Sequence, residues 1–424
     1  MRDSVAPVKK RIPSFLRHVG PGVVTGAADD DPSGIATYTQ AGAQFGTGLL
    51  WTVFLSLPFM IAIQMVSARI GRVTGQGVAA NLRDHMPRWL LLGLVGLLVV
   101  ANTINIAADI GAMGEALQLV VGGGQHFHSL AFGAVTVLLQ VFVPYRRLAH
   151  ILKWLTLTLF AYVAAVFVVD VPWGHVLHDL VVPKLQWRSD YWMMIVALLG
   201  TTISPYLFFW QASQEVEELR QKGGRRGSDA EVWRALRRVK LDTWIGMIFS
   251  NAIAFFVMVV GGAVLFKAGI HDVTSAAQAA DALRPLAGDF AFWLFAGGII
   301  ATGLLAVPVL ASSAAYAVAE AFGWEEGLER HWHEAKRFYA IIGIATLAGT
   351  ALDFTPVDPM KALYWSAVIN GVVAVPIMAA MMMLVAREKV MGAFVASRRT
   401  RWLGWAGTAL MGFAVLMMLR DVVA

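Results

Sequence analysis

The 424-residue sequence contains no cysteine, and only 15% of its residues are charged, whereas 58% are hydrophobic and the mean hydropathy is +0.63. The lack of cysteine excludes disulfides and thiolate metal sites. The shortage of charge excludes an ordinary soluble protein, because no long polar stretch is present. We find no phosphate-binding loop, nucleophile triad or dinucleotide fingerprint, and we expect neither an enzyme nor a cofactor. Composition places the chain in a bilayer.

Long apolar runs divide the sequence into eleven predicted transmembrane helices. A helix needs roughly twenty apolar residues to cross about 30 Å of hydrocarbon. The third and eighth runs are long enough to tilt or to extend beyond the membrane. The predicted class is therefore an all-α integral membrane protein. The runs lie at 19–43, 47–68, 89–120, 127–145, 150–171, 190–214, 241–266, 290–320, 338–353, 360–386 and 402–419.

The placement of lysine and arginine predicts the orientation. Residues 1–18 lack a cleavable apolar core and are a predicted cytoplasmic tail. With that tail inside, 28 of the 34 basic residues are cytoplasmic, as the positive-inside rule requires. The basic loop 220–240 could bind anionic lipid or nucleic acid, but we interpret it as a topology signal and expect no nucleic-acid partner. The prediction is a bacterial inner (plasma) membrane protein whose C-terminus lies outside, with six basic residues on that side: Lys184, Arg188, Lys267, Arg284, Lys361 and Arg420.

The first span contains an acidic interruption, the run Asp29-Asp30-Asp31-Pro32-Ser33-Gly34. Carboxylates facing lipid at membrane depth would cost several kcal/mol each. Proline removes a backbone donor, and glycine beside it lets the chain leave helical geometry. Freed carbonyls and an acidic side chain at such a point make a cation site. The alternative is that the span begins at residue 35 and the acids lie among the lipid headgroups.

The sixth span contains a similar interruption around Ser204 and Pro205. Alone, it would also fit an ordinary proline kink. Five helices separate the two interruptions, as expected for inverted five-helix repeats with a broken first helix. We therefore predict a transport core at 19–386, with repeats at about 19–171 and 190–386. A cytoplasmic loop and the eleventh helix occupy 387–424.

Both interruptions resemble those of the Nramp family of divalent-metal transporters, which share the LeuT-type fold. The likeness is carried by His18-Val-Gly-Pro-Gly22, Asp31-Pro32, Gln40-Ala-Gly-Ala-Gln44, the segment 67–75, and Leu199 to Pro205. The resemblance implies metal uptake through a central site formed by the first and sixth helices.

The sequence departs from the family pattern at the residues expected to bind metal. The family's Asp-Pro-Gly-Asn is here Asp-Pro-Ser-Gly, so Gly34 replaces an asparagine ligand, and its Met-Pro-His is here Ser-Pro-Tyr, with Ser204 and Tyr206. Oxygen ligands favour hard ions over the soft metals that sulfur prefers. The family's proton-route acids align with Asn105 and Ala108, which do not titrate. The pattern is similar to that of Nramp-related magnesium transporters, which implies little or no proton coupling.

These residues define the predicted site. Asp31 is the predicted direct anionic ligand, and Asp30 adds negative charge. The carbonyls of Ala28 and Thr201, with the hydroxyl of Thr201 or Ser204, supply neutral oxygens. A second set could line the ion path, although Asn105 and Asp109, with Asn102 on the same face, could equally join neighbouring helices. This path set comprises Gly34, Asn105, Asp109, Tyr206 and Asn370.

The prediction is therefore an importer of divalent metal ions, Mg²⁺ and Mn²⁺ above all, with weak or no proton coupling. One alternative is a proton-coupled Mn²⁺ or Fe²⁺ importer of the same family. Another is a sodium-coupled organic-solute symporter of the same fold, although the Asp-Pro interruption puts a carboxylate where such carriers offer bare backbone. A membrane protein without transport activity is a third. The partners expected are the transported ion and the lipid bilayer.

Overall fold

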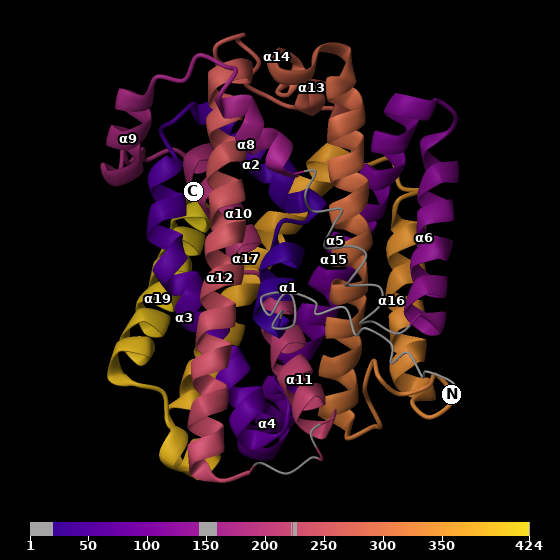
Figure 1. The fold of residues 1–424 in the computed structure, drawn as a ribbon, viewed down its shortest axis with the longest axis vertical. Coiled ribbons are helices and arrows are strands. Elements are labelled where there is room, and N and C mark those ends of the chain that lie inside the picture. Colours follow the sequence, from indigo (N-terminus) through magenta and orange to yellow (C-terminus); the bar gives the residue numbers. More distant parts are fainter. Residues whose placement is uncertain (1–19, 144–158, 222, 224–226, 424) are drawn as a thin grey trace, which may run out of the picture.

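The computed structural model of the protein describes residues 20–143, 159–221, 223 and 227–423, and within these ranges it contains helices and no β-strand. The helices form a bundle with α1 near its centre (Figure 1). In this view α3 and α19 lie along one side, α6 and α16 along the other, and α4 at the lower end. The predicted tail, residues 1–18, lies outside the described residues.

The first predicted span consists of two short helices. α1 (Pro21–Asp29) ends at the carboxylates, and α2 (Pro32–Phe45) begins at the proline. Between them, Asp30 leaves helical geometry with φ −86° and ψ 52°, and Asp31 is extended with ψ 171°. Pro32 occupies the first helical position, where its missing N–H has no partner to lose. A helix precedes the carboxylates, so the alternative start at residue 35 is wrong.

The sixth predicted span is split in the same way. α10 (Ser189–Thr202) ends where Ile203 adopts φ −124° and ψ 59°, and α11 (Pro205–Gln221) begins at the next proline. Ser204 is the one residue left between Ile203 and α11. A kink alone would leave the helix continuous, so this is a break and not an ordinary proline kink.

Unbroken helices surround these two pairs. A π-helical turn, η3 (Gly262–Phe266), extends α12. The long helices are α3 (Leu50–Thr74), α5 (Arg88–Val121), α6 (Gln125–Phe142), α12 (Asp229–Gly261), α15 (Ala291–Phe322), α16 (Lys336–Leu352), α17 (Pro359–Val385) and α19 (Arg398–Val423). Shorter elements are α4 (Val78–His85), α8 (Phe160–Val166), α9 (Trp173–Val181), α13 (Ala276–Asp281), α14 (Arg284–Ala287), η4 (Gly288–Phe290), α18 (Glu388–Met391) and η5 (Gly392–Phe394).

Seven stretches in the described ranges are long and apolar enough to cross a membrane, with α10 and α11 counted as one. The other four of the eleven predicted spans fall on shorter or more polar helices. The first is broken, α6 opens with polar residues, and α16 has 17 residues. The fifth falls partly on 144–158, outside the described residues. The seven are Leu50–Thr74, Arg88–Val121, Ser189–Gln221, Asp229–Phe266, Arg284–Phe322, Pro359–Val385 and Arg398–Arg420.

Small residues let the central helices approach closely. A Cβ at Gly200 of α10 would collide with the backbone of α17 at Ala367 and Gly371. A second seam joins α1 to α12, where a Cβ at Gly26 would meet the backbone of Gly246. Helices in lipid associate through close backbone contact of this kind, because lipid tails are as apolar as the side chains and no hydrophobic effect drives the helices together. These two seams fix the half-helices that flank both breaks.

Candidate functional site

The two breaks face each other at the centre of the bundle. Tyr206, at the start of α11, donates from its hydroxyl to the carbonyl oxygen of Ala28 in α1, at 2.9 Å. Gly34 lies against the other side of the second break, because a Cβ built on it would be 3.0 Å from the hydroxyl oxygen of Thr201. The structure thus brings together the residues predicted from both interruptions.

Asp31 is buried and has four donors within hydrogen-bond distance, one of which, the Tyr206 hydroxyl, shares its single proton with the carbonyl of Ala28. Its Oδ1 caps α2 by accepting from the Gly34 amide and the Ser33 hydroxyl, each at 2.7 Å. Its Oδ2 accepts from the amide of Asn105 at 3.1 Å and from the hydroxyl of Tyr206 at 3.3 Å. Uncharged donors hold a carboxylate in place without neutralising it. Asp31 is therefore a buried carboxyl group that uncharged donors fix in position between the two breaks.

α5 contributes Asn105 and Asp109 to the same region. Asn105 contacts Asp31 directly, and its own Oδ1 has no hydrogen-bond partner among the described residues. Asp109, one turn further along, is fully buried and interacts electrostatically with Asp31. Asn102, by contrast, donates to the carbonyl of Leu310 in α15 at 2.9 Å. Asn102 joins two helices, whereas Asn105 contacts Asp31 directly; a place for Asn105 and Asp109 on an ion path stays a prediction.

Ser204 is turned back toward its own helix. Its hydroxyl donates to the carbonyl oxygens of Gly200, at 3.0 Å, and Thr201, at 2.8 Å. Ser204 therefore polarises the Thr201 carbonyl predicted to bind the ion and presents only its own lone pairs to a ligand. Since a carbonyl oxygen has two lone pairs, Thr201 keeps one acceptor position.

Asp30 and Asp31 have different hydrogen-bond partners. Asp29 and Asp30 both accept from the hydroxyl of Ser250 in α12, at 2.6 Å and 3.2 Å. The sequence analysis assigned no role to Asp29 or Ser250. Asp29 could have been chosen, because it belongs to the acidic run. Ser250 could not, because a serine in an apolar helix more than two hundred residues away gives no such signal.

Asn370 lies in α17, one residue before the glycine that packs on α10. It is buried, and neither side-chain polar atom has a hydrogen-bond partner among the described residues. Among the described residues, no side-chain hydrogen bond joins Asn370 to another predicted site residue. Its neighbour Gly371 contacts Val196 of α10, which places Asn370 near the second half-helix pair.

The site differs from a preformed metal cage. Within the described ranges, no three histidine, aspartate or glutamate side chains are grouped to hold a metal ion. Instead, one carboxylate is combined with carbonyl, hydroxyl and amide oxygens. Mg²⁺ keeps several of its waters and takes only one or two carboxylates from protein. The residues predicted to bind the ion therefore offer oxygen donors and a single carboxylate that contacts both breaks.

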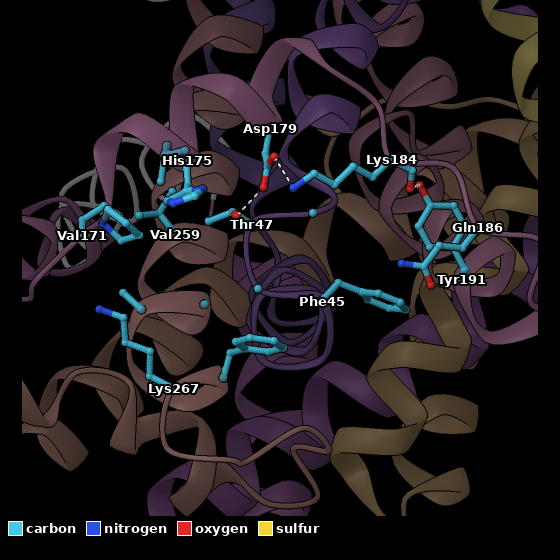
Figure 2. Close-up of a pocket in the computed structure, with 17 residues that line it drawn as sticks. Phe45, Thr47, Val171, His175, Asp179, Lys184, Gln186, Tyr191, Val259 and Lys267 are labelled. Carbon is cyan, nitrogen blue, oxygen red and sulfur yellow. Dashed lines mark hydrogen bonds and ion pairs between the residues drawn. The ribbon is translucent and has the colours of Figure 1, made fainter.

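A cavity of about 370 Å³ lies elsewhere, at the end of α2 beside α9 and η3. In it, Asp179 accepts from the Thr47 hydroxyl and pairs with Lys184, both at 2.6 Å (Figure 2). Although partial burial acts to raise the pKa of Asp179, hydrogen bonds from Lys184, Thr47 and His178 lower it to about 2. None of the predicted site residues lines this cavity.

The chain is similar in sequence to proteins of known family over most of its length. A Klebsiella pneumoniae protein named "Divalent metal cation transporter MntH" is 27% identical over 403 residues, which cover 93% of this chain and 92% of that protein. A protein of the same name from Granulibacter bethesdensis is 25% identical over 420 residues, covering 96% and 88%.

Solved structures with the same fold include an Eremococcus coleocola manganese transporter, with a TM-score of 0.72 and 18% identity over 97% of this chain and 88% of that one. A nucleobase-cation-symport-1 family transporter has a TM-score of 0.59 and 14% identity, covering 95% and 93%. The fold is of the LeuT type. The profile described as "Natural resistance-associated macrophage protein-like" matches residues 22–421, and the chain therefore belongs to the Nramp family.

Proposed function

We propose that this chain carries divalent metal ions across the membrane, Mg²⁺ and Mn²⁺ above all, with weak or no proton coupling. It is a transporter and not an enzyme. The observation that carries the proposal is Asp31, a buried carboxylate at the meeting point of two broken helices, held only by uncharged donors. A cation bound there removes the cost of a buried unpaired charge.

The choice of ion follows from the ligands. Asp31, the carbonyls of Ala28 and Thr201 and the hydroxyl oxygen of Ser204 are all oxygen donors, and the sequence has no cysteine to supply sulfur. Oxygen ligands bind Mg²⁺ and Mn²⁺ by similar electrostatics. Ca²⁺ prefers six to eight oxygens, which is more than this arrangement supplies. The names of the relatives support a divalent-metal substrate, and the donor chemistry supports Mg²⁺ beside Mn²⁺.

Competition for uptake tests the proposal. Proteoliposomes containing the full chain should take up Mn²⁺, and excess Mg²⁺ should inhibit that uptake and itself be transported. Ca²⁺ should compete poorly. Transport of Mn²⁺ without any response to Mg²⁺ at about the millimolar concentrations of weak divalent sites would contradict the hard-ion proposal and favour a manganese or iron importer.

A second measurement tests coupling. Asn105 and Tyr206, which contact Asp31, do not exchange protons at neutral pH, so we expect metal uptake to move few or no protons. A pH-sensitive dye inside vesicles held at fixed membrane potential reports this directly. A metal-dependent acidification as large as the metal flux would overturn the weak-coupling proposal and identify Asp109, the fully buried carboxyl one turn beyond Asn105 on α5, as the first residue to replace.

The orientation is also part of the proposal, with the N-terminus in the cytoplasm and the C-terminus outside. The natural absence of cysteine makes this simple to measure. A single cysteine placed at Arg420 should react with an impermeant maleimide added to intact cells, and one placed at Arg83 should react only after permeabilisation. The reverse pattern would invert the topology.

A further inference from the structure

One exposed face of α9 is apolar. Trp173, Leu177 and Val181 lie four residues apart and therefore share one side of the helix, which we call the apolar stripe. Their exposed fractions are 44%, 60% and 64%. Exposed large apolar side chains continue before and after α9 in the chain, and they are Phe167, Val168, Val182, Leu185 and Trp187. An exposed apolar surface of this kind marks a site of interaction.

Two polar residues of α9 face the protein instead. His175 and Asp179 line the cavity at the end of α2, and the buried carboxylate of Asp179 accepts a hydrogen bond from Thr47 (Figure 2). A surface helix of a water-soluble protein has the opposite arrangement, with apolar residues on the core and charged residues in water. Because α9 turns a carboxylate inward and leaves the apolar stripe outside, water is not the solvent that its outer face fits.

A second connecting segment at the same end of the bundle lacks such a surface. Residues 267–283, which contain α13, expose no large apolar side chain. In Figure 1, α13 lies at the top of the bundle, whereas α9 lies lower and at its side. α9 also packs on α3, which is long and apolar enough to cross a membrane. The contrast places the apolar stripe beside the membrane and residues 267–283 in water.

The exposed residues suit the boundary between lipid headgroups and acyl chains. Tryptophan collects there because its ring is apolar and its N–H can donate a hydrogen bond, and this segment exposes both Trp173 and Trp187. The spanning segment Ser189–Gln221 begins directly after Arg188, so the chain is already at the edge of the membrane here. Lipid therefore reaches the apolar stripe without a partner protein.

We propose that residues 167–187 form an interfacial surface, on which the apolar stripe of α9 lies in the boundary between lipid headgroups and acyl chains. Asp179 then links this surface to the transport core, because it accepts a hydrogen bond from Thr47, just after α2, and pairs with Lys184. α2 begins at the first break, so a helix held by lipid fixes its far end. The inference goes beyond the proposed function and does not depend on which ion is carried.

Spin labels on single cysteines test the proposal in lipid nanodiscs, and the natural absence of cysteine makes each labelled position unique. Oxygen dissolves in acyl chains and a nickel chelate stays in water, so the collision rates of a label with the two reagents measure its immersion. We expect Trp173→Cys, Leu177→Cys and Val181→Cys to collide mainly with oxygen, at about 5–10 Å below the lipid phosphates. His175→Cys and His178→Cys, on the other side of the helix, should collide mainly with the nickel chelate.

Two further positions calibrate the collision rates. Ala268→Cys lies in the segment 267–283 and should report water, and Leu97→Cys, exposed on α5, should report lipid. Collision rates that match Ala268→Cys at every labelled position of α9 would overturn the proposal. Shielding of the apolar stripe from both reagents would overturn it as well, because protein would then cover the stripe. Elution volume checks that each labelled chain is folded, and Val182→Cys and Leu185→Cys test the same surface if a label on α9 disrupts folding.

Discussion

The break between α1 and α2 and the break between α10 and α11 have similar backbones but different chemistry. In both, a short helix ends, one or two residues leave helical geometry, and a proline starts the next helix. The first break supplies three carboxylates, whereas the second supplies hydroxyls and carbonyls and no charge. In the proposed function, the first break supplies the charged ligand and the second supplies neutral oxygens.

The two breaks also differ in whether their side chains accept or donate hydrogen bonds. Asp31 accepts every one of its hydrogen bonds from neighbours. Ser204 donates within its own half-helix, and Tyr206 donates across to the first break. Of the donors to Asp31, only Tyr206 comes from the second break, since Ser33 and Gly34 belong to α2 and Asn105 to α5. An ion that binds between them must compete with Tyr206 for Asp31 and for the carbonyl of Ala28.

The largest expected effect comes from removing the charge of the first break. Asp31→Asn keeps the size of the side chain and should reduce metal flux in proteoliposomes to background, because the carboxylate proposed to contact the ion directly is lost. Asp289→Asn, at an exposed carboxylate, is the control and should transport normally. A folded Asp31→Asn protein with normal flux would show that the two breaks do not divide charge and neutral ligands in this way.

Tyr206→Phe removes the contact between the breaks. It deletes the donor to Ala28 and to Asp31 while keeping the buried ring. A hydrogen bond to a charged group stabilises by about 1.5–3 kcal/mol, so the metal concentration for half-maximal uptake should change about tenfold or more. The matched control is Tyr191→Phe, whose hydroxyl donates to the carbonyl of Lys184 away from both breaks. An equal change in both variants would mean that Tyr206 has no special role.

Gly34→Ala tests how closely the breaks approach. The added Cβ would lie 3.0 Å from the Thr201 hydroxyl oxygen and 3.3 Å from the Tyr38 ring, so a shift of a few tenths of an ångström is required. We expect a several-fold loss of transport rate with little loss of folded protein, because the cost of slight overpacking is about 1–3 kcal/mol. Gly343→Ala, where the added Cβ meets open space, is the control. Unchanged transport would show that the breaks tolerate separation.

Both breaks could be predicted from the sequence because proline acts locally. Pro32 and Pro205 each remove a backbone donor, and small or acidic neighbours mark where the helix ends. Asp31 could be chosen because its position beside Pro32 made it part of a break. The count of eleven spans stays a prediction, since the runs at 127–145, 150–171 and 338–353 fall on α6, α8 and α16, which are not among the seven stretches long and apolar enough to cross a membrane.

Side-chain direction could not be predicted, because it depends on packing between distant segments. The role of Ser250 arises from the glycine seam that brings α12 onto α1. The same approach of α12 lets Ser250 donate to Asp30 as well as to Asp29. Ser204 was predicted to face the ion, but its hydroxyl found nearer acceptors in its own helix. A free serine hydroxyl next to a helix end commonly makes such a local bond.

Replacing Ser204 by methionine should change the transport rate least and the preference among metal ions most clearly. The substitution removes the two hydrogen bonds to Gly200 and Thr201 and places a thioether at the second break. Sulfur favours softer metals, whereas Mg²⁺ is bound by oxygen. Ser204→Met should therefore transport Mn²⁺ and Cd²⁺ at rates similar to the unmodified chain and lose competition by Mg²⁺. Ser204→Ala separates the two causes, since it loses the same hydrogen bonds without adding sulfur. Ser204→Ala and Ser204→Met could change the metal preference equally. In that case the loss of the hydrogen bond to the Thr201 carbonyl sets the selectivity, and the break between α10 and α11 does not select ions by the softness of its ligands.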